Sequence, residues 1–184
     1  MIYPVVVYGH PVLRKVAISI DKDYEGLEQL IADMWNTMYK ADGLGLAAPQ
    51  IGKSIRLFVI DADVLKDEFP ELAGFKKVFI NAQIEFLESK FESTAEGCLS
   101  LPMINEKVKR PSRIRIKYQD EHFNHYEEEY DGFTARVIQH EYDHIEGKLF
   151  IDYLNPFKRF MLKGKLNRIA KGEIELAYQI KIAE

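Results

Sequence analysis

The sequence predicts an α+β fold in which mainly antiparallel strands pack around a central helix, with an amphipathic helix in the N-terminal half and another helix near the C-terminus. Three observations support this fold class. Three segments repeat apolar residues every three or four positions, as one face of a helix does. Other segments are β-rich or alternate between polar and apolar residues. These strands come in blocks rather than alternating with helices, which favours α+β over a wound parallel sheet.

The composition is typical of one globular domain. The chain has 184 residues, 47% of them apolar, with no repeat or linker, so residues 1–184 are expected to form a single domain. The net charge of −4 does not indicate a DNA-binding or membrane-surface protein. The apolar run at residues 2–8 contains Pro4 and is too short for a signal peptide or a membrane span. We therefore expect a cytoplasmic protein.

The first predicted helix covers residues 24–41. Asp23 is its expected N-cap, and Gly43 lies just beyond its end. The apolar face consists of Leu27, Leu30, Ile31, Met34 and Met38.

The second predicted helix covers residues 134–147. The third begins with Asn155 as N-cap and Pro156 at the first helical position, and extends to about residue 170.

The strands separate these helices. Residues 113–118 alternate cleanly and predict a half-exposed strand, and residues 120–125 predict a hairpin connection. All the strands that the pattern predicts lie at residues 56–60, 78–80, 113–118, 126–130 and 174–182.

The second helix carries a candidate metal site. His140 and His144 are four residues apart, so both imidazoles project from one face of the helix. Glu141 lies beside them, where its carboxylate can take a proton from water held by a bound ion. The alternative is a chance pattern on a surface helix.

The rest of this helix favours the metal site. Ile138, Tyr142 and Ile145 form an apolar stripe on the opposite side, and Val137 continues the face of the two histidines. A helix that is apolar on both sides is expected to be buried. Burying two histidines and a carboxylate is costly unless they are paired or bound to metal.

A third protein ligand must come from elsewhere in the chain. Phe150 stands where one metalloprotease pattern has a third His. Glu173 and Glu175 are downstream candidates, but they lie in a predicted strand without a distinctive pattern. Cys98, in the segment Glu96–Pro102, offers a thiolate suited to zinc or iron(II). The alternative for Cys98 is a small buried hydrophobe, which is common for a lone cysteine.

A further segment, Gly43–Gly52, contains two early glycines, small residues and Pro49. It predicts a tight turn that another group approaches closely. It lacks the Lys-Ser/Thr of a phosphate loop, and on its own it leaves the amide of Gln50 without a purpose.

Taken together, three segments resemble the signature motifs of the peptide deformylases. They are Gly43–Gln50, Glu96–Ser100 and Gln139–His144, in the order of that family. The stretch His10–Arg14 also resembles the family, and the likeness covers about residues 5–155.

The resemblance implies a metallohydrolase domain in which Cys98, His140 and His144 hold one divalent ion with water at a fourth position. Fe(II) is the expected ion, and Zn, Ni or Co can substitute. The implied reaction is hydrolysis of the N-formyl group from the initiator methionine of newly made polypeptides, releasing formate. A metal-bound hydroxide would attack the formyl carbon, with Glu141 as general acid and base.

The resemblance also implies the roles of neighbouring residues. The Gln50 amide and the Leu99 backbone N–H would stabilise the oxyanion. The peptide backbone would hydrogen-bond to Leu44, Gly45 and Gly97, and the methionine pocket would be lined by Leu44, Phe133, Val137 and His140. Some family members have an Arg where residues 103–105 stand here. The role of Arg136 and the alignment of residues 61–77 stay open.

The C-terminal part, residues 156–184, is expected to form a basic helix and a terminal strand. Residues 156–171 contain six basic residues and no acidic one. One interpretation is an amphipathic helix with a solvated basic face. The other is a helix that docks on ribosomal RNA near the peptide exit, beside the substrate.

Two other functions are consistent with parts of the sequence. A metalloprotease that cuts internal peptide bonds would share the helix motif but leaves Cys98 and Gln50 unexplained. A non-catalytic domain could bind metal for stability, but structural sites usually have four protein ligands, and three are evident here.

Overall fold

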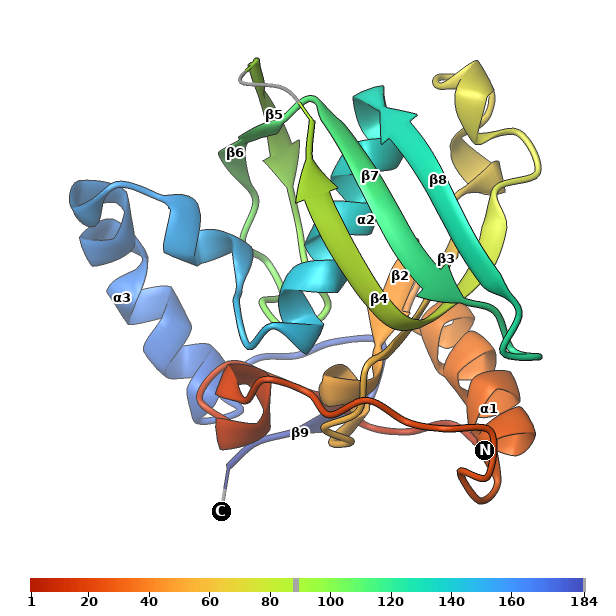
Figure 1. Cartoon of the computed structure of the whole chain (residues 1–184). Coiled ribbons are helices and arrows are strands. Elements are labelled where there is room, and N and C mark those ends of the chain that lie inside the picture. Colours follow the sequence, from red (N-terminus) through yellow and green to blue (C-terminus); the bar gives the residue numbers. More distant parts are fainter. Residues whose placement is uncertain (88–89, 184) are drawn as a thin grey trace.

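The computed structural model describes residues 1–87 and 90–183 (Figure 1). The α-helices are α1 (Leu27–Lys40), α2 (Gly132–Ile145) and α3 (Pro156–Ala170). The strands are β1 (Val5–Val6), β2 (Gly45–Ala47), β3 (Leu57–Asp61), β4 (Lys76–Phe86), β5 (Phe91–Glu96), β6 (Glu106–Pro111), β7 (Arg113–Gln119), β8 (His125–Asp131) and β9 (Ile180–Lys181). Short 3-10 helices lie at Pro11–Arg14, Ala48–Ile51, Asp63–Leu65, Pro70–Leu72 and Phe150–Tyr153.

The main sheet is antiparallel throughout, with strand order β2-β3-β4-β7-β8. Because successive side chains of a strand point to opposite faces, β3 contributes to two cores. Phe58 and Ile60 pack into the core that contains Ala135 and Ile138 of α2. Leu57 and Val59 pack into the core of α1. The two helices therefore cover opposite faces of this part of the sheet, which agrees with their places in Figure 1.

Two small pairs of strands complete the architecture. The β5–β6 hairpin forms its own antiparallel pair, with Glu96 opposite Glu106 at one end. β1 pairs in parallel with β9, so a strand near the start of the chain lies beside a strand near its end. Within the described residues, no helix combines the length and apolar character needed to cross a bilayer.

The α+β architecture with α2 at its centre confirms the predicted fold class, and α3 begins as predicted. The Asn155 side chain accepts a hydrogen bond from Lys158 N at 2.8 Å, as an N-cap does. The predicted cap at Asp23 is wrong. Asp23 N donates to Asp21 Oδ1 in a preceding turn, and Gly26, with φ 71°, is the N-cap of α1 instead.

The strand predictions were less complete. β4 is longer than its predicted core, and the final ladder contains only Ile180–Lys181 of the predicted 174–182. The sequence analysis missed β1, β2, β5 and β6. β1 and β2 are only two and three residues long, which is too short to show an alternating pattern. β5 and β6 are largely polar, so neither hydrophobic alternation nor β-propensity distinguishes them from loops.

Candidate metal centre

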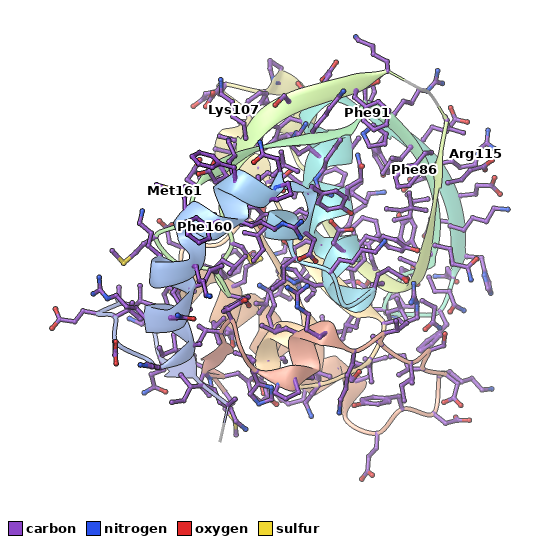
Figure 2. All side chains as sticks on the ribbon, turned by 90° about the vertical axis from the view of Figure 1, so that its left-hand side faces the viewer. Phe86, Phe91, Lys107, Arg115, Phe160 and Met161 are labelled. Atoms are coloured by element: carbon purple, nitrogen blue, oxygen red, sulfur yellow. The ribbon has the colours of Figure 1, made fainter. Side chains whose placement is uncertain are left out.

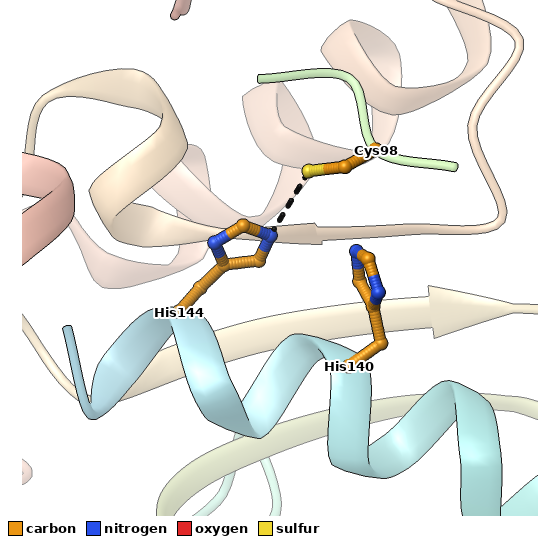
Figure 3. Close-up of side chains that lie close together, drawn as sticks. All are labelled: Cys98, His140 and His144. Atoms are coloured by element: carbon orange, nitrogen blue, oxygen red, sulfur yellow. Dashed lines mark hydrogen bonds between the residues drawn. The ribbon is translucent and has the colours of Figure 1, made fainter. Parts of the chain in front are cut away.

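Three side chains named from the sequence converge at the centre of the molecule. The ligand atoms of Cys98, His140 and His144 all lie within 4.8 Å of one another, and Cys98 Sγ is 3.3 Å from His144 Nε2 (Figure 3). The two histidines lie one turn apart on α2, and Cys98 lies in the loop that follows β5. Glu173 and Glu175 lie exposed on the C-terminal segment and are not part of this cluster.

The cluster fits a divalent metal ion. One thiolate and two imidazoles are the donors that Zn(II) and Fe(II) accept in proteins. Burial, helped by the nearby His140, holds the pKa of His144 well below its usual value, so its imidazole is neutral as a metal ligand must be. Beside the cluster, Glu141 Oε2 is buried and has no hydrogen-bond partner in the described chain. Burying a carboxylate oxygen without a partner costs free energy unless water or a metal ion contacts it.

His140 is held by a carboxylate. Its Nδ1 lies 2.9 Å from Glu96 Oε2, at the end of β5, which leaves Nε2 to face the cluster. Burial opposes ionisation of Glu96, but hydrogen bonds from His140 and Arg110 hold the pKa of this carboxyl well below its usual range. Glu96 is therefore a carboxylate at neutral pH and fixes the imidazole ring.

A buried network of charges supports Glu96, and sequence reasoning missed most of it. Arg110 of β6 donates to both Glu96 oxygens, at 2.6 and 2.9 Å, and to Asp143 Oδ2 at 2.7 Å. Arg136 donates to Glu96 Oε1 at 2.7 Å, and Tyr153 donates to Asp143. Arg136 also binds the carbonyls of residues 92 and 108, which supplies the structural partners that the sequence left open. Val108 and Arg110 are the buried residues of β6, but the charged sequence of this strand does not show which of its faces is buried.

Glu141 occupies space that Gly45 leaves free. A Cβ at residue 45 would lie 2.5 Å from Glu141 Oε1 and 2.7 Å from two further atoms of that side chain. Burial raises the pKa of Glu141 to about 7, a value that a nearby cation would lower again. The carboxylate is thus placed, by packing, to exchange a proton within the site.

Gln50 is held beside the cysteine. Its Oε1 accepts a hydrogen bond from Ala47 N at 2.8 Å, which directs the amide group toward Ser100 Oγ, 3.2 Å away, and Cys98 Sγ, 3.6 Å away. The side chain is buried, so its N–H donors face protein or ligand rather than bulk water. Among residues 1–87 and 90–183, the backbone N–H of Leu99 finds no acceptor.

These side chains border a cavity of about 660 Å³. Its lining includes all the residues expected to contact substrate: Leu44, Gly45, Gly97, Phe133, Val137 and His140. Phe133 stacks on Phe69 at 4.2 Å between ring centroids, so residues 61–77, which could not be aligned, support this wall. Met103 and Asn105, which follow the cysteine motif, also line the cavity.

Comparisons with known proteins find relatives that match nearly the whole chain. The family model described as polypeptide deformylase matches residues 2–160. A peptide deformylase from Flavobacterium psychrophilum is 52% identical, over 99% of this chain and 97% of its own length. One from Cytophaga hutchinsonii is 49% identical, over 98% and 97%.

Solved structures give the same result. The peptide deformylase from Thermus thermophilus superposes with a TM-score of 0.82 and 42% identity, covering 94% of this chain and 99% of that one. The enzyme from Legionella pneumophila gives 0.81 and 37%, covering 94% and 98%. The similarity therefore includes both the architecture and the segments that form the centre.

The charge network generates a stability prediction. Arg110→Met should lower the free energy of unfolding by about 3–5 kcal/mol, because it leaves Asp143 and Glu96 buried with fewer partners. Metal affinity should fall about 10–100-fold, because Glu96 no longer orients His140 firmly. Urea denaturation of the metal-free protein and competition with a chelator measure the two effects.

Arg115→Met is the matched control. Arg115 pairs with Glu85 and Glu129 at the surface of the sheet, so its loss should cost no more than about 1 kcal/mol and leave metal affinity unchanged. Equal losses in the two variants would contradict a special role for the buried network.

Proposed function

The chain belongs to the polypeptide deformylase family, and we propose how its own residues carry out the family's reaction. The protein removes the N-formyl group from newly made polypeptides. The observation that carries the mechanism is the placement of Glu141 and Gln50 along one cavity with Cys98 and His140.

The family is metal-dependent, and we assign Cys98, His140 and His144 as the ligands. Their convergence within 4.8 Å and the support of His140 by Glu96 favour this assignment. When bound, the ion supplies Lewis acidity that makes water nucleophilic near neutral pH and polarises the formyl oxygen. We propose Fe(II) as the cellular ion, because a mixed thiolate and imidazole set suits it, with Zn, Ni or Co as substitutes.

Glu141 is assigned as general base and then general acid. It accepts a proton from the water that attacks the formyl carbon and delivers it to the leaving amine as the C–N bond breaks. Its burial and its unpaired Oε2 support this role, because the carboxylate can exchange a proton without competition from another protein partner.

Gln50 and Leu99 are assigned as oxyanion donors. The amide of Gln50 is already oriented by Ala47, so little reorganisation accompanies charge development. The unengaged N–H of Leu99 offers a second donor. Removing one such donor typically costs ~2.7–4 kcal/mol of transition-state stabilisation.

The substrate peptide is proposed to lie extended between residues 44–45 and Gly97, with backbone hydrogen bonds to both sides. The edge position of β2 in the sheet supports this arrangement, since an edge strand has unpaired backbone groups. The methionine side chain would occupy the apolar part of the cavity beside Phe133 and Val137. This encloses the reacting amide and excludes water other than the nucleophile.

The ribosome is proposed as a docking partner through α3, and the cytoplasm as the site of action. α3 buries Leu162, Leu166 and Ile169 against the molecule. Its outer surface exposes basic residues together with Phe157, so it is not an ordinary helix with a purely polar outer face. Phe160 and Met161 are also exposed there (Figure 2). Lys158 is paired with Glu106, whereas Arg159, Lys163 and Lys165 are exposed for contact with phosphates.

Formate release tests the reaction. Protein purified without oxygen and loaded with Fe(II) or Ni(II) should release formate from formyl-Met-Ala-Ser. Glu141→Gln should lower kcat/KM by at least about 100-fold because proton transfer is lost, while metal content measured by mass spectrometry stays unchanged. Loss of the metal in this variant would reassign Glu141 as a ligand. Cleavage of internal peptide bonds in casein, without formate release, would favour a protease.

The fit between Gly45 and Glu141 provides a steric test. Gly45→Ala should displace the Glu141 carboxylate and lower kcat/KM by about 10–100-fold, with metal content retained. Gly164→Ala is the control, because a Cβ there meets nothing within 4 Å and the substitution favours α3. Full activity of Gly45→Ala would show that the position of Glu141 does not depend on this contact.

Ribosome docking is tested by salt and charge. Replacing Arg159, Lys163 and Lys165 with Gln should weaken co-sedimentation with ribosomes at least about tenfold and reduce its salt dependence. Activity on formyl-Met-Ala-Ser should not change. Replacing the exposed Lys15, Lys22 and Lys66 is the matched control. Ribosome binding that is unaffected by either salt or the α3 substitutions would exclude this mode of docking.

A further inference from the structure

The segment that follows α3 returns toward the candidate metal centre. In residues 174–181, here called the C-terminal segment, alternate side chains are partly buried and the intervening ones are exposed. Its end is fixed to the first strand: Val5 N donates to Gln179 O at 2.8 Å, and Val7 N donates to Lys181 O at 3.1 Å. These two bonds fix the end of the C-terminal segment to the first strand.

Two of its inward residues border the cavity. Leu176 and Tyr178 line it together with Cys98 and Leu99. The Tyr178 hydroxyl donates a hydrogen bond to the carbonyl oxygen of Leu99 at 2.9 Å. This bond joins residues 79 positions apart and connects the C-terminal segment to the loop that carries the cysteine.

Three successive carbonyls of that loop each accept a hydrogen bond. Cys98 O accepts from Leu101 N at 3.0 Å, and Ser100 O accepts from Tyr8 N at 2.9 Å. The carbonyl between them is the one that Tyr178 holds. Because its donor is a side chain, this bond can be removed without changing the backbone. The hydrogen bond from Tyr178 fixes the carbonyl of Leu99. It therefore restricts rotation of the Leu99 backbone, whose N–H has no acceptor among the described residues.

We propose that Tyr178 is a positioning residue: by holding the Leu99 carbonyl, it keeps the Leu99 N–H directed at the reacting carbonyl oxygen of the substrate. Leu176, on the same segment, forms a wall for the peptide. This inference rests on the proposed role of the Leu99 amide as an oxyanion donor. The C-terminal segment thus aids the reaction without touching the reacting atoms.

Kinetics with the metal-loaded enzyme provides the first test. Tyr178→Phe should lower kcat for formyl-Met-Ala-Ser about three- to tenfold, the equivalent of one neutral hydrogen bond, with KM within about twofold of the parent. Leu176→Ala should instead raise KM and leave kcat unchanged, because it removes only a binding wall. Tyr24→Phe, a hydroxyl deletion at a residue that does not line the cavity, is the control. If Tyr178→Phe changes KM alone, or changes neither constant, the proposal is overturned.

A spectroscopic measurement separates this inference from the proposed function. Leu99–Ser100 is the only Leu-Ser pair in the sequence, so carbonyl-13C leucine and 15N serine give one carbonyl-to-amide NMR signal. In the zinc-loaded protein, Tyr178→Phe should shift the Leu99 carbonyl resonance, and Tyr24→Phe should not. An unchanged resonance would refute the contact. A shifted resonance in an enzyme whose parent releases no formate would refute the proposed function instead.

Discussion

The ion pair between Glu96 and Arg110 is the interaction on which the organisation of the centre depends. It links the last residue of β5 to its partner strand β6, and through Asp143 and His140 it attaches this hairpin to α2. Desolvating these charges is costly, and the cost is offset only while every partner is in place. The same geometry that stabilises the charges also orients an imidazole. Fold stability and metal affinity are thus coupled through one set of side chains.

A second constraint comes from the alternation of side chains along β3. Because neighbouring residues on this strand enter different cores, α1 and α2 are held on opposite faces of the same sheet. Rigid elements then present Gly45 at the edge of the sheet to Glu141 on α2, where only a glycine leaves enough room. The position of the carboxylate therefore follows from backbone packing.

Local patterns were sufficient for part of this structure. The spacing of His140 and His144 on a helix, the cap at Asn155 and the alternation at residues 113–118 are short-range signals, and each is present in the fold. Arg110, Asp143 and Tyr178 act through contacts across 14 to 79 residues, so no window of sequence displays them. Cys98 was an intermediate case. Its residue type suggested a ligand, but its place beside two histidines depended on how the hairpin packs.

The separation between Cys98 and His144 has a consequence for the folding pathway. The two residues are 46 positions apart, and the segment between them contains β6, β7, β8 and most of α2. An ion bound to both would act as a cross-link that closes this long loop and reduces the entropy of partly unfolded states. Local helix contacts bring the two histidines together, whereas the thiol lies beside them only when the β5–β6 hairpin is docked on α2. A complete coordination set would therefore require both the helix and the docked hairpin.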